Sequence, residues 1–148
     1  MRKCSAVLFG LLVLALLGCG KQAPGGATPK SNPAAAQAGI ESAEAWLALV
    51  DDGSFPKSWE EAAAYFKSAT SQADWEKAVR AVRTPLGKVV SRKVKSQQYA
   101  TSLPGAPDGE YVVVEYDTTF EKKANAVETI TPMLDKDGKW RVSGYYIK

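Results

Sequence analysis

The chain has 148 residues, the length of one ordinary domain, and nineteen Lys and Arg side chains oppose sixteen Asp and Glu side chains. This nearly even balance excludes a strongly basic nucleic-acid-binding protein, so we expect no nucleic acid among the partners. Hydrophobic residues make up 45% and charged residues 24%, as in a folded domain rather than a disordered chain.

The first eighteen residues have the features of a secretory leader. Arg2 and Lys3 supply positive charge, and residues 6–17 form an almost wholly apolar run. This run is shorter than the about 20 apolar residues that a membrane-spanning helix needs. The sequence therefore predicts a removable signal peptide over residues 1–18.

The end of this leader, the sequence LLGC, resembles the bacterial lipobox. The resemblance implies cleavage before Cys19 and a diacylglyceryl group on its thiol, which would attach the protein to a lipid bilayer. Gly20 follows the cysteine, and by similarity to sorted lipoproteins this implies the periplasmic face of the outer membrane, where the host has one. Cys4 leaves with the leader, so we expect no disulfide in the folded part.

Residues 19–37 predict an acylated cysteine followed by a flexible tether. The stretch is rich in Gly, Pro and Ala and has no aromatic residue, so it cannot bury enough surface to offset the entropy of ordering. As a coil it would span about 23 Å. The remainder, residues 38–148, predicts a single domain.

Three helices are predicted over residues 38–84. The first ends before Gly53, the second begins at a capping box formed by Ser58 and Glu61, and the third begins at Ser71 and stops before Pro85. Apolar residues at helical spacing support them: Ile40, Ala43, Leu47 and Val50, then Trp59, Ala62, Ala63 and Phe66, then Trp75, Ala78, Val79 and Val82.

The tryptophans of these helices have two interpretations. Their helical spacing favours anchoring of the core over an aromatic platform for a ligand, although Trp46 remains a candidate ligand contact. Arg80 and Arg83 lie off the apolar face of the third helix, and we expect both to be solvated.

Four strands are predicted over residues 88–103, 110–121, 124–134 and 139–147. Alternation in the second directs Val112, Val114, Tyr116, Thr118 and Phe120 to one face, which we expect to meet the helices. In the last strand Trp140 and Val142 are expected to point inward. Pro132 indicates an edge or a bulge, and residues 135–138 a hairpin turn.

This order of elements predicts an α+β fold in which three N-terminal helices pack on a curved four-stranded antiparallel meander. A hollow between helices and sheet would be a usual place for a small-molecule pocket, and Tyr116 is our candidate contact there. The turn-rich loop over residues 102–110 supplies further candidates for partner binding: Leu103, Pro104 and Pro107. The alternative is a rigid connection that only sets the strand register.

Most catalytic chemistry is excluded by the residues present. Without histidine, and without cysteine once the leader is removed and Cys19 acylated, neither a Ser-His-Asp nor a Cys-His site can form. Common zinc sites need the same residues, so we expect no metal and no cofactor. Asp135 and Asp137 lack the other ligands of a calcium loop.

Two further charged groups on the strands are expected to face solvent. Glu115 and Asp117 share the strand face opposite Tyr116, away from the helices, which argues against a catalytic pair. A small basic cluster is interpreted as part of a solvated strand; its members are Lys88, Arg92, Lys93 and Lys95.

Several separated motifs resemble the bacterial family of unknown function DUF4019; they are Ala45–Val50, Ser58–Ala62, Ala81–Gly87, Thr101–Val113 and Gly138–Tyr146. The resemblance covers essentially the whole folded part and implies a small exported or membrane-tethered domain without assigned activity. The helices-then-sheet order is also similar to the cystatin-like and nuclear-transport-factor-like cone folds, some of which are enzymes such as ketosteroid isomerases.

The sequence favours a lipid-anchored envelope domain that is not an enzyme and binds an envelope protein or a small apolar ligand. One alternative is a pocket enzyme of the ketosteroid-isomerase type using Tyr116 or the Glu115 and Asp117 pair, which predicts a deep pocket with a buried carboxylate. Another is a homodimer that pairs its sheet faces. It would use Tyr111, Val113 and Tyr145.

Overall fold

A computed structural model describes residues 31–148 of the chain. The predicted leader, Cys19 and most of the predicted tether lie outside the described residues. Within residues 31–148, none of the helices combines the length and the apolar character needed to cross a membrane.

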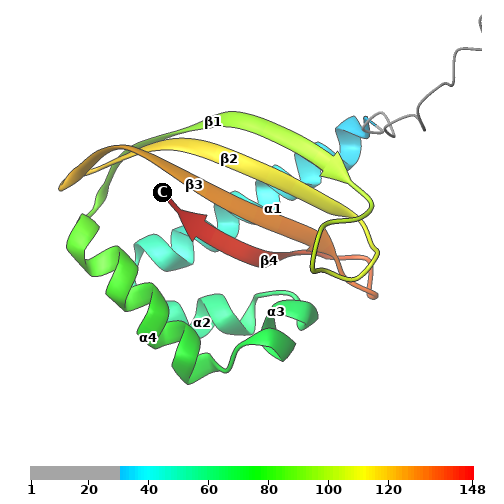
Figure 1. Cartoon of the computed structure of the whole chain (residues 1–148), viewed down its shortest axis with the longest axis horizontal. Helices are drawn as coiled ribbons and strands as arrows, with labels where there is room; N and C mark the ends of the chain where they lie inside the picture. The colour runs from blue at the N-terminus through cyan, green and yellow to red at the C-terminus, as the bar shows by residue number, and fades with distance from the viewer. Residues whose placement is uncertain (1–30) are drawn as a thin grey trace, which may run out of the picture.

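The second half of the chain forms one antiparallel sheet (Figure 1). Its strands are β1 (Val89–Ala100), β2 (Tyr111–Phe120), β3 (Lys123–Leu134) and β4 (Trp140–Ile147). They lie side by side in chain order, so the predicted four-stranded meander is confirmed. The register shifts at Thr131 and Pro132 and leaves Ser143 of β4 as the extra residue, so a bulge forms opposite the proline that indicated one.

The first half is helical and packs against this sheet. The helices are α1 (Pro33–Asp51), α2 (Phe55–Glu60), α3 (Ala64–Ala69) and α4 (Gln72–Arg83), followed by the single 3-10 turn η1 (Thr84–Leu86). In Figure 1, α1 lies behind the sheet and contacts all four strands, and the shorter helices lie below β4. The α+β class is therefore confirmed.

α1 starts earlier than the sequence pattern predicted, at Pro33 rather than near residue 38. The side chain of Asn32 accepts a hydrogen bond from the Ala35 N–H, and proline fits the first helical turn because it has no N–H to satisfy there. Residues 33–37 thus belong to the helix rather than to the tether.

The predicted second helix is two short helices, and the predicted capping box does not form. Ser58 lies inside α2, where its hydroxyl donates to the Phe55 carbonyl at 2.8 Å and accepts from Trp75 Nε1 at 2.9 Å. The chain turns between α2 and α3, where the Ala63 N–H donates to the Val142 carbonyl at 2.9 Å. The Ser58 hydroxyl, which the sequence pattern assigned to a helix cap, instead accepts a hydrogen bond from the buried indole of Trp75.

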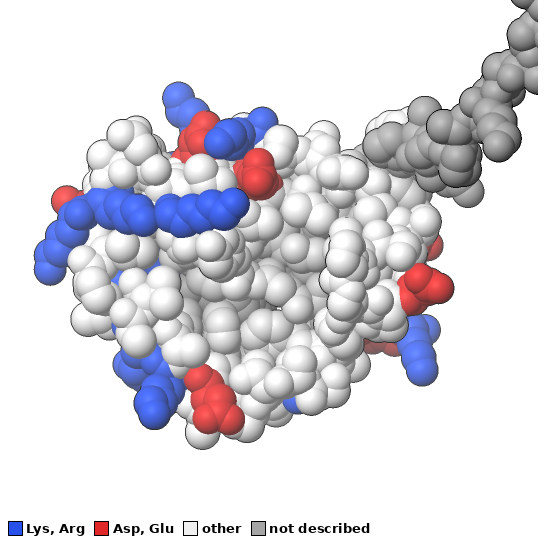
Figure 2. All heavy atoms as spheres, viewed as in Figure 1, with Lys and Arg blue, Asp and Glu red and all other residues white. Residues whose placement is uncertain are grey.

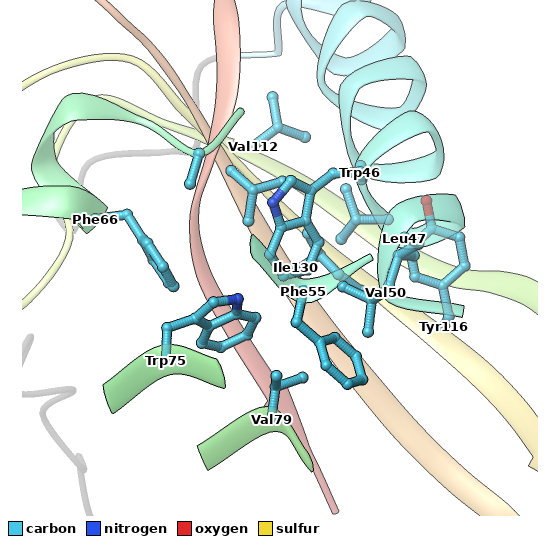
Figure 3. Close-up of a cluster of buried hydrophobic side chains, with 14 residues drawn as sticks. Trp46, Leu47, Val50, Phe55, Phe66, Trp75, Val79, Val112, Tyr116 and Ile130 are labelled. Atoms are coloured by element: carbon cyan, nitrogen blue, oxygen red, sulfur yellow. The ribbon is translucent and has the colours of Figure 1, made fainter. Parts of the chain in front are cut away.

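The main core lies between α1, the inner face of the sheet and α4 (Figure 3). Trp46 is 3% exposed, its ring centroid lies 5.6 Å from that of Trp75, and its Nε1 donates to the Ser58 carbonyl at 2.7 Å. The structure thus supports the core-anchor interpretation of Trp46. α1 approaches β2 so closely at Gly39 that an added Cβ would lie 2.6 Å from Val112 Cβ.

Candidate functional site

The inner face of the sheet carries a carboxylate that sequence analysis did not single out. Glu128 on β3 is fully buried and accepts hydrogen bonds from Arg92 Nε at 2.7 Å, the Thr118 hydroxyl at 2.6 Å and the Tyr145 hydroxyl at 2.7 Å. Arg83 Nη1 lies 3.4 Å from the same carboxylate. The sequence did indicate that Glu128 faces inward, because it lies two residues before the inward-facing Ile130 and side chains two apart on a strand share a face.

Asp51, at the end of α1, is the second acid of this group. Arg92 donates to both of its oxygens, at 2.7 and 3.0 Å, and Arg83 Nη2 donates at 2.8 Å. Two acids and two arginines therefore form a charge-neutral network that joins α1, α4, β1 and β3. We call Asp51, Arg83, Arg92 and Glu128 the buried ion network; Asp51 is its most accessible member, with 27% of its side chain exposed.

The prediction that Arg83 and Arg92 are solvated is wrong. Their side chains are 7% and 15% exposed. The register places Arg92 opposite Thr118, on the inner face of the sheet, and the guanidinium of Arg83 lies 4.9 Å from the ring centroid of Phe120. Only tertiary packing brings these two cations to the two acids.

The pKa shifts of Asp51 and of its neighbour Tyr145 favour a fixed arrangement of charge. Burial alone would raise the pKa of Asp51, but the hydrogen bonds and positive charges of Arg92 and Arg83 outweigh it and lower that pKa. Burial, followed by the charge of Glu128, raises the pKa of Tyr145, which stays a neutral donor. Each carboxylate oxygen of Asp51 and Glu128 already accepts a hydrogen bond from an arginine or a hydroxyl, as expected of side chains that hold the helices on the sheet.

Tyr116 borders a hollow between α1 and β1. The residue is 2% exposed, and among residues 31–148 its buried hydroxyl has no hydrogen-bond partner. Burial and then the charge of Glu44 raise the pKa of Tyr116 to about 12. The hollow has a volume of about 290 Å³; its lining consists of Glu44, Leu47, Ala48, Asp51, Arg92, Val94 and Tyr116.

A larger open cleft of about 770 Å³ lies near α3, the 101–110 loop and the β3–β4 hairpin. Pro107 lines it, whereas Leu103 packs on the small cluster beneath the loop and Pro104 is exposed. The loop is held in place because the Tyr65 hydroxyl donates to the Gly105 carbonyl at 2.9 Å and the Tyr111 hydroxyl donates to the Pro107 carbonyl at 2.6 Å. Of the three loop candidates, only Pro107 faces the cleft.

The lining of the cleft has an excess of acidic side chains. Five acidic and three basic side chains line it, a formal charge of −2. Arg141 donates to Asp135 at 3.0 Å and to Asp137 at 2.9 and 2.8 Å, and its two hydrogen bonds to Asp137 lower the pKa of that carboxyl to about 2. The acids left without such a partner among the described residues are Glu60, Glu61 and Asp108. We call this feature the acidic cleft.

The other candidate carboxylates lie on the outer face of the sheet, as predicted. Glu115 accepts from the Ser96 hydroxyl at 3.0 Å, and the exposed Asp117 lies 3.5 Å from Lys95 Nζ. The buried carboxylate that the enzyme hypothesis required is Glu128 instead, and two arginines neutralise it.

The residues proposed for sheet-to-sheet pairing do not share a surface. The 101–110 loop covers Tyr111, which is fully buried, and Tyr145 points inward opposite Ile130. Tyr145 points inward because the bulge at Pro132 shifts the alternation of inward and outward side chains in β4 by one residue between Val142 and Tyr145. That part of the homodimer prediction is therefore wrong.

Charge on the visible face of the molecule is dispersed. Figure 2 shows lysine and arginine in small groups near its margin, several beside acidic side chains, with an uncharged centre. Over residues 31–148, no cluster of three or more histidine, cysteine or acidic side chains is arranged to hold a metal ion.

Comparison with known proteins gives the family of the chain. The model of the family described as "Protein of unknown function (DUF4019)" matches residues 42–145, so the chain belongs to this family, and the resemblance noted from its motifs is confirmed. A comparison with curated proteins and another with solved structures each gave no match. The similarity to the cystatin-like and nuclear-transport-factor-like cones stays a prediction.

Proposed function

We propose that this member of the DUF4019 family is a lipid-anchored, non-catalytic binding module of the bacterial cell envelope. In this proposal the domain binds a protein partner through the acidic cleft. The observation that carries the proposal is this open cleft of about 770 Å³, in which five acidic side chains outnumber three basic ones.

The anchor is inferred from the leader and from Cys19, with the outer membrane as the expected location. Because α1 begins at Pro33, the segment between anchor and domain shortens to residues 19–32, which as a coil would span about 20 Å. Figure 1 places the start of α1 at the same end of the molecule as the 101–110 loop and the β3–β4 hairpin. The acidic cleft would then face a partner close to the membrane.

The lining of the acidic cleft determines which partner chemistry suits it. Tyr65, Pro107 and Leu134 offer apolar surface, and exposed carboxylates surround it. A lysine or arginine side chain can lay its aliphatic stem on such a surface while its charged end reaches an acid. We therefore infer a partner that presents a short basic segment.

The non-catalytic part of the proposal follows from how the acids are engaged. The oxygens of Glu128 and Asp51 are occupied by arginine and hydroxyl donors, and Asp117 faces solvent beside Lys95. A general acid or base needs a proton that it can exchange with a substrate. This arrangement supports binding rather than proton transfer.

Photocrosslinking in intact bacteria tests the proposed function. A photoreactive amino acid replaces Lys136 in the acidic cleft or, as a control, the exposed Lys95 on β1. We expect a discrete adduct only from position 136. It should disappear when Glu60→Gln, Glu61→Gln and Asp108→Asn are combined, and remain in the outer-face control Glu115→Gln with Asp117→Asn. Equal adducts from both positions would contradict the proposal. An adduct from position 136 that remains after the three cleft acids are neutralised would also contradict it.

The anchor has a separate test. Cells grown with a labelled fatty acid should incorporate the label into the protein, and Cys19→Ser should abolish that incorporation while leaving the fold unchanged. A wild-type protein that takes up no label would refute the lipid attachment.

A further inference from the structure

The Tyr116 hydroxyl is a buried donor that the fold does not satisfy. The ring packs in the main core, and Figure 3 shows the hydroxyl oxygen beside α1, away from Trp46 and Trp75. No described residue lies within hydrogen-bonding distance of it. Buried polar atoms almost always have a partner, so an unpartnered hydroxyl on a residue that lines a hollow points to a ligand group that would accept a hydrogen bond from it.

The hollow beside this hydroxyl has apolar walls and one open side. Leu47 and Ala48 of α1 face Val94 of β1, and Val94 remains 44% exposed because β1 is one of the two edge strands of the sheet. Its volume of about 290 Å³ lies at the lower end of the about 300–1,000 Å³ of small-molecule sites. The occupant must therefore be small, with a short aliphatic part.

The polar groups around the hollow are of two kinds. Arg92, which also lines the hollow, donates three hydrogen bonds within the buried ion network, and a guanidinium carries five N–H groups, so two of its donors are not used in that network. Glu44 at the exposed side forms no ion pair with any residue that the structure describes, whereas Asp51 is neutralised by Arg83 and Arg92. The hollow thus combines donors in its depth with one uncompensated negative charge at its mouth.

We propose that this hollow binds a small molecule that carries an acceptor oxygen and a protonated amine separated by a short aliphatic chain, as in an amino alcohol. The oxygen accepts from the Tyr116 hydroxyl, the carbons lie against Leu47 and Val94, and the ammonium pairs with Glu44. An anionic ligand is disfavoured by Glu44, and an alkane offers no acceptor to Tyr116. The site is separate from the acidic cleft and does not rest on partner binding there.

Ethanolamine and n-propylamine are matched probes for this proposal, because they have nearly the same shape and only ethanolamine carries the oxygen. Each is titrated into the isotope-labelled full-length protein in detergent, and amide chemical shifts are followed by NMR. We expect saturable shifts around residues 44–51, 92–94 and 116 with ethanolamine, and at least about tenfold weaker binding of n-propylamine. Equal binding of the two probes, shifts elsewhere in the molecule, or no shifts at the highest soluble concentration would overturn the proposal.

Two variants test the individual contacts. Tyr116→Phe and Glu44→Gln should each weaken ethanolamine binding about tenfold. The matched controls are Tyr146→Phe, an exposed tyrosine on β4, and Glu41→Gln, an exposed glutamate three residues before Glu44 on α1, which should leave binding unchanged. Because phenylalanine keeps the ring of Tyr116 in the core, that variant should fold, and unchanged binding by it would count against the site.

Discussion

Replacement of Glu128 by glutamine tests whether the buried ion network holds the helices on the sheet. The carboxylate is fully buried, and each of its oxygens accepts from one arginine and one hydroxyl. The hydroxyls of Thr118 and Tyr145 can rotate to accept from a new amide. The arginines cannot, so the glutamine NH₂ group must face an arginine N–H in either orientation.

The expected cost follows from this geometry. Glu128→Gln leaves Arg83 and Arg92, both largely buried, with Asp51 as their only acid. Removal of one member of a buried ion group costs about 3–5 kcal/mol, because the remaining charge is not compensated. At about 4 °C per kcal/mol for a domain of this size, the midpoint of thermal unfolding should fall by roughly 12–20 °C.

Urea unfolding monitored by the fluorescence of the buried tryptophans measures this loss. The control is Glu115→Gln, the same substitution on the outer face of the sheet, which should change the free energy of unfolding by less than about 0.5 kcal/mol. If Glu128→Gln is as mild as this control, the network does not hold the fold together as argued.

Three further predictions follow from the same structure. Tyr116→Phe removes an unsatisfied hydroxyl, so the free energy of unfolding in urea should stay unchanged or rise by about 1 kcal/mol. Tyr145→Phe removes two hydrogen bonds, so the free energy of unfolding should fall by about 1–3 kcal/mol. If Tyr116→Phe proves the more destabilising of the two, both assignments are contradicted. Gly39→Ala should destabilise the protein by about 1–3 kcal/mol despite the better helix propensity of alanine, because the new Cβ meets Val112; a gain in Tm would show that α1 can move away. The pKa of Asp51 in the folded chain lies below its ordinary value of 3.8, so stability is present above that value and is lost as pH falls through the lower, folded pKa. Asp51→Asn should flatten this acid dependence, and an unchanged pH profile would argue against the ion pairs.

Much of the fold could be predicted from local patterns. Alternation in β2 places Val112, Val114 and Phe120 against the helices, and the Ser71 cap and the 135–138 hairpin form where the sequence indicates them. These features depend on residues close together in the chain, for which spacing and turn chemistry are sufficient.

The errors arose where a distant contact decides the role of a residue. Ser58 satisfies Trp75 instead of capping a helix, and the bulge at Pro132 turns Tyr145 inward. Arg83 and Arg92 each resemble surface cations in their own element and are buried only because Asp51 and Glu128 meet them in three dimensions. The hollow at Tyr116 likewise depends on how α1 crosses the edge strand, which no local pattern encodes.

Hydrogen exchange on the complex with the crosslinked partner tests the central claim most directly, namely that the acidic cleft is the binding surface. The measurement compares amide exchange of the full-length protein alone and with its partner bound. We predict that protection concentrates in residues 60–67, 107–109 and 133–141, which line the cleft. Protection of the outer sheet face over residues 93–98 and 113–119, with an unchanged cleft, would contradict the claim.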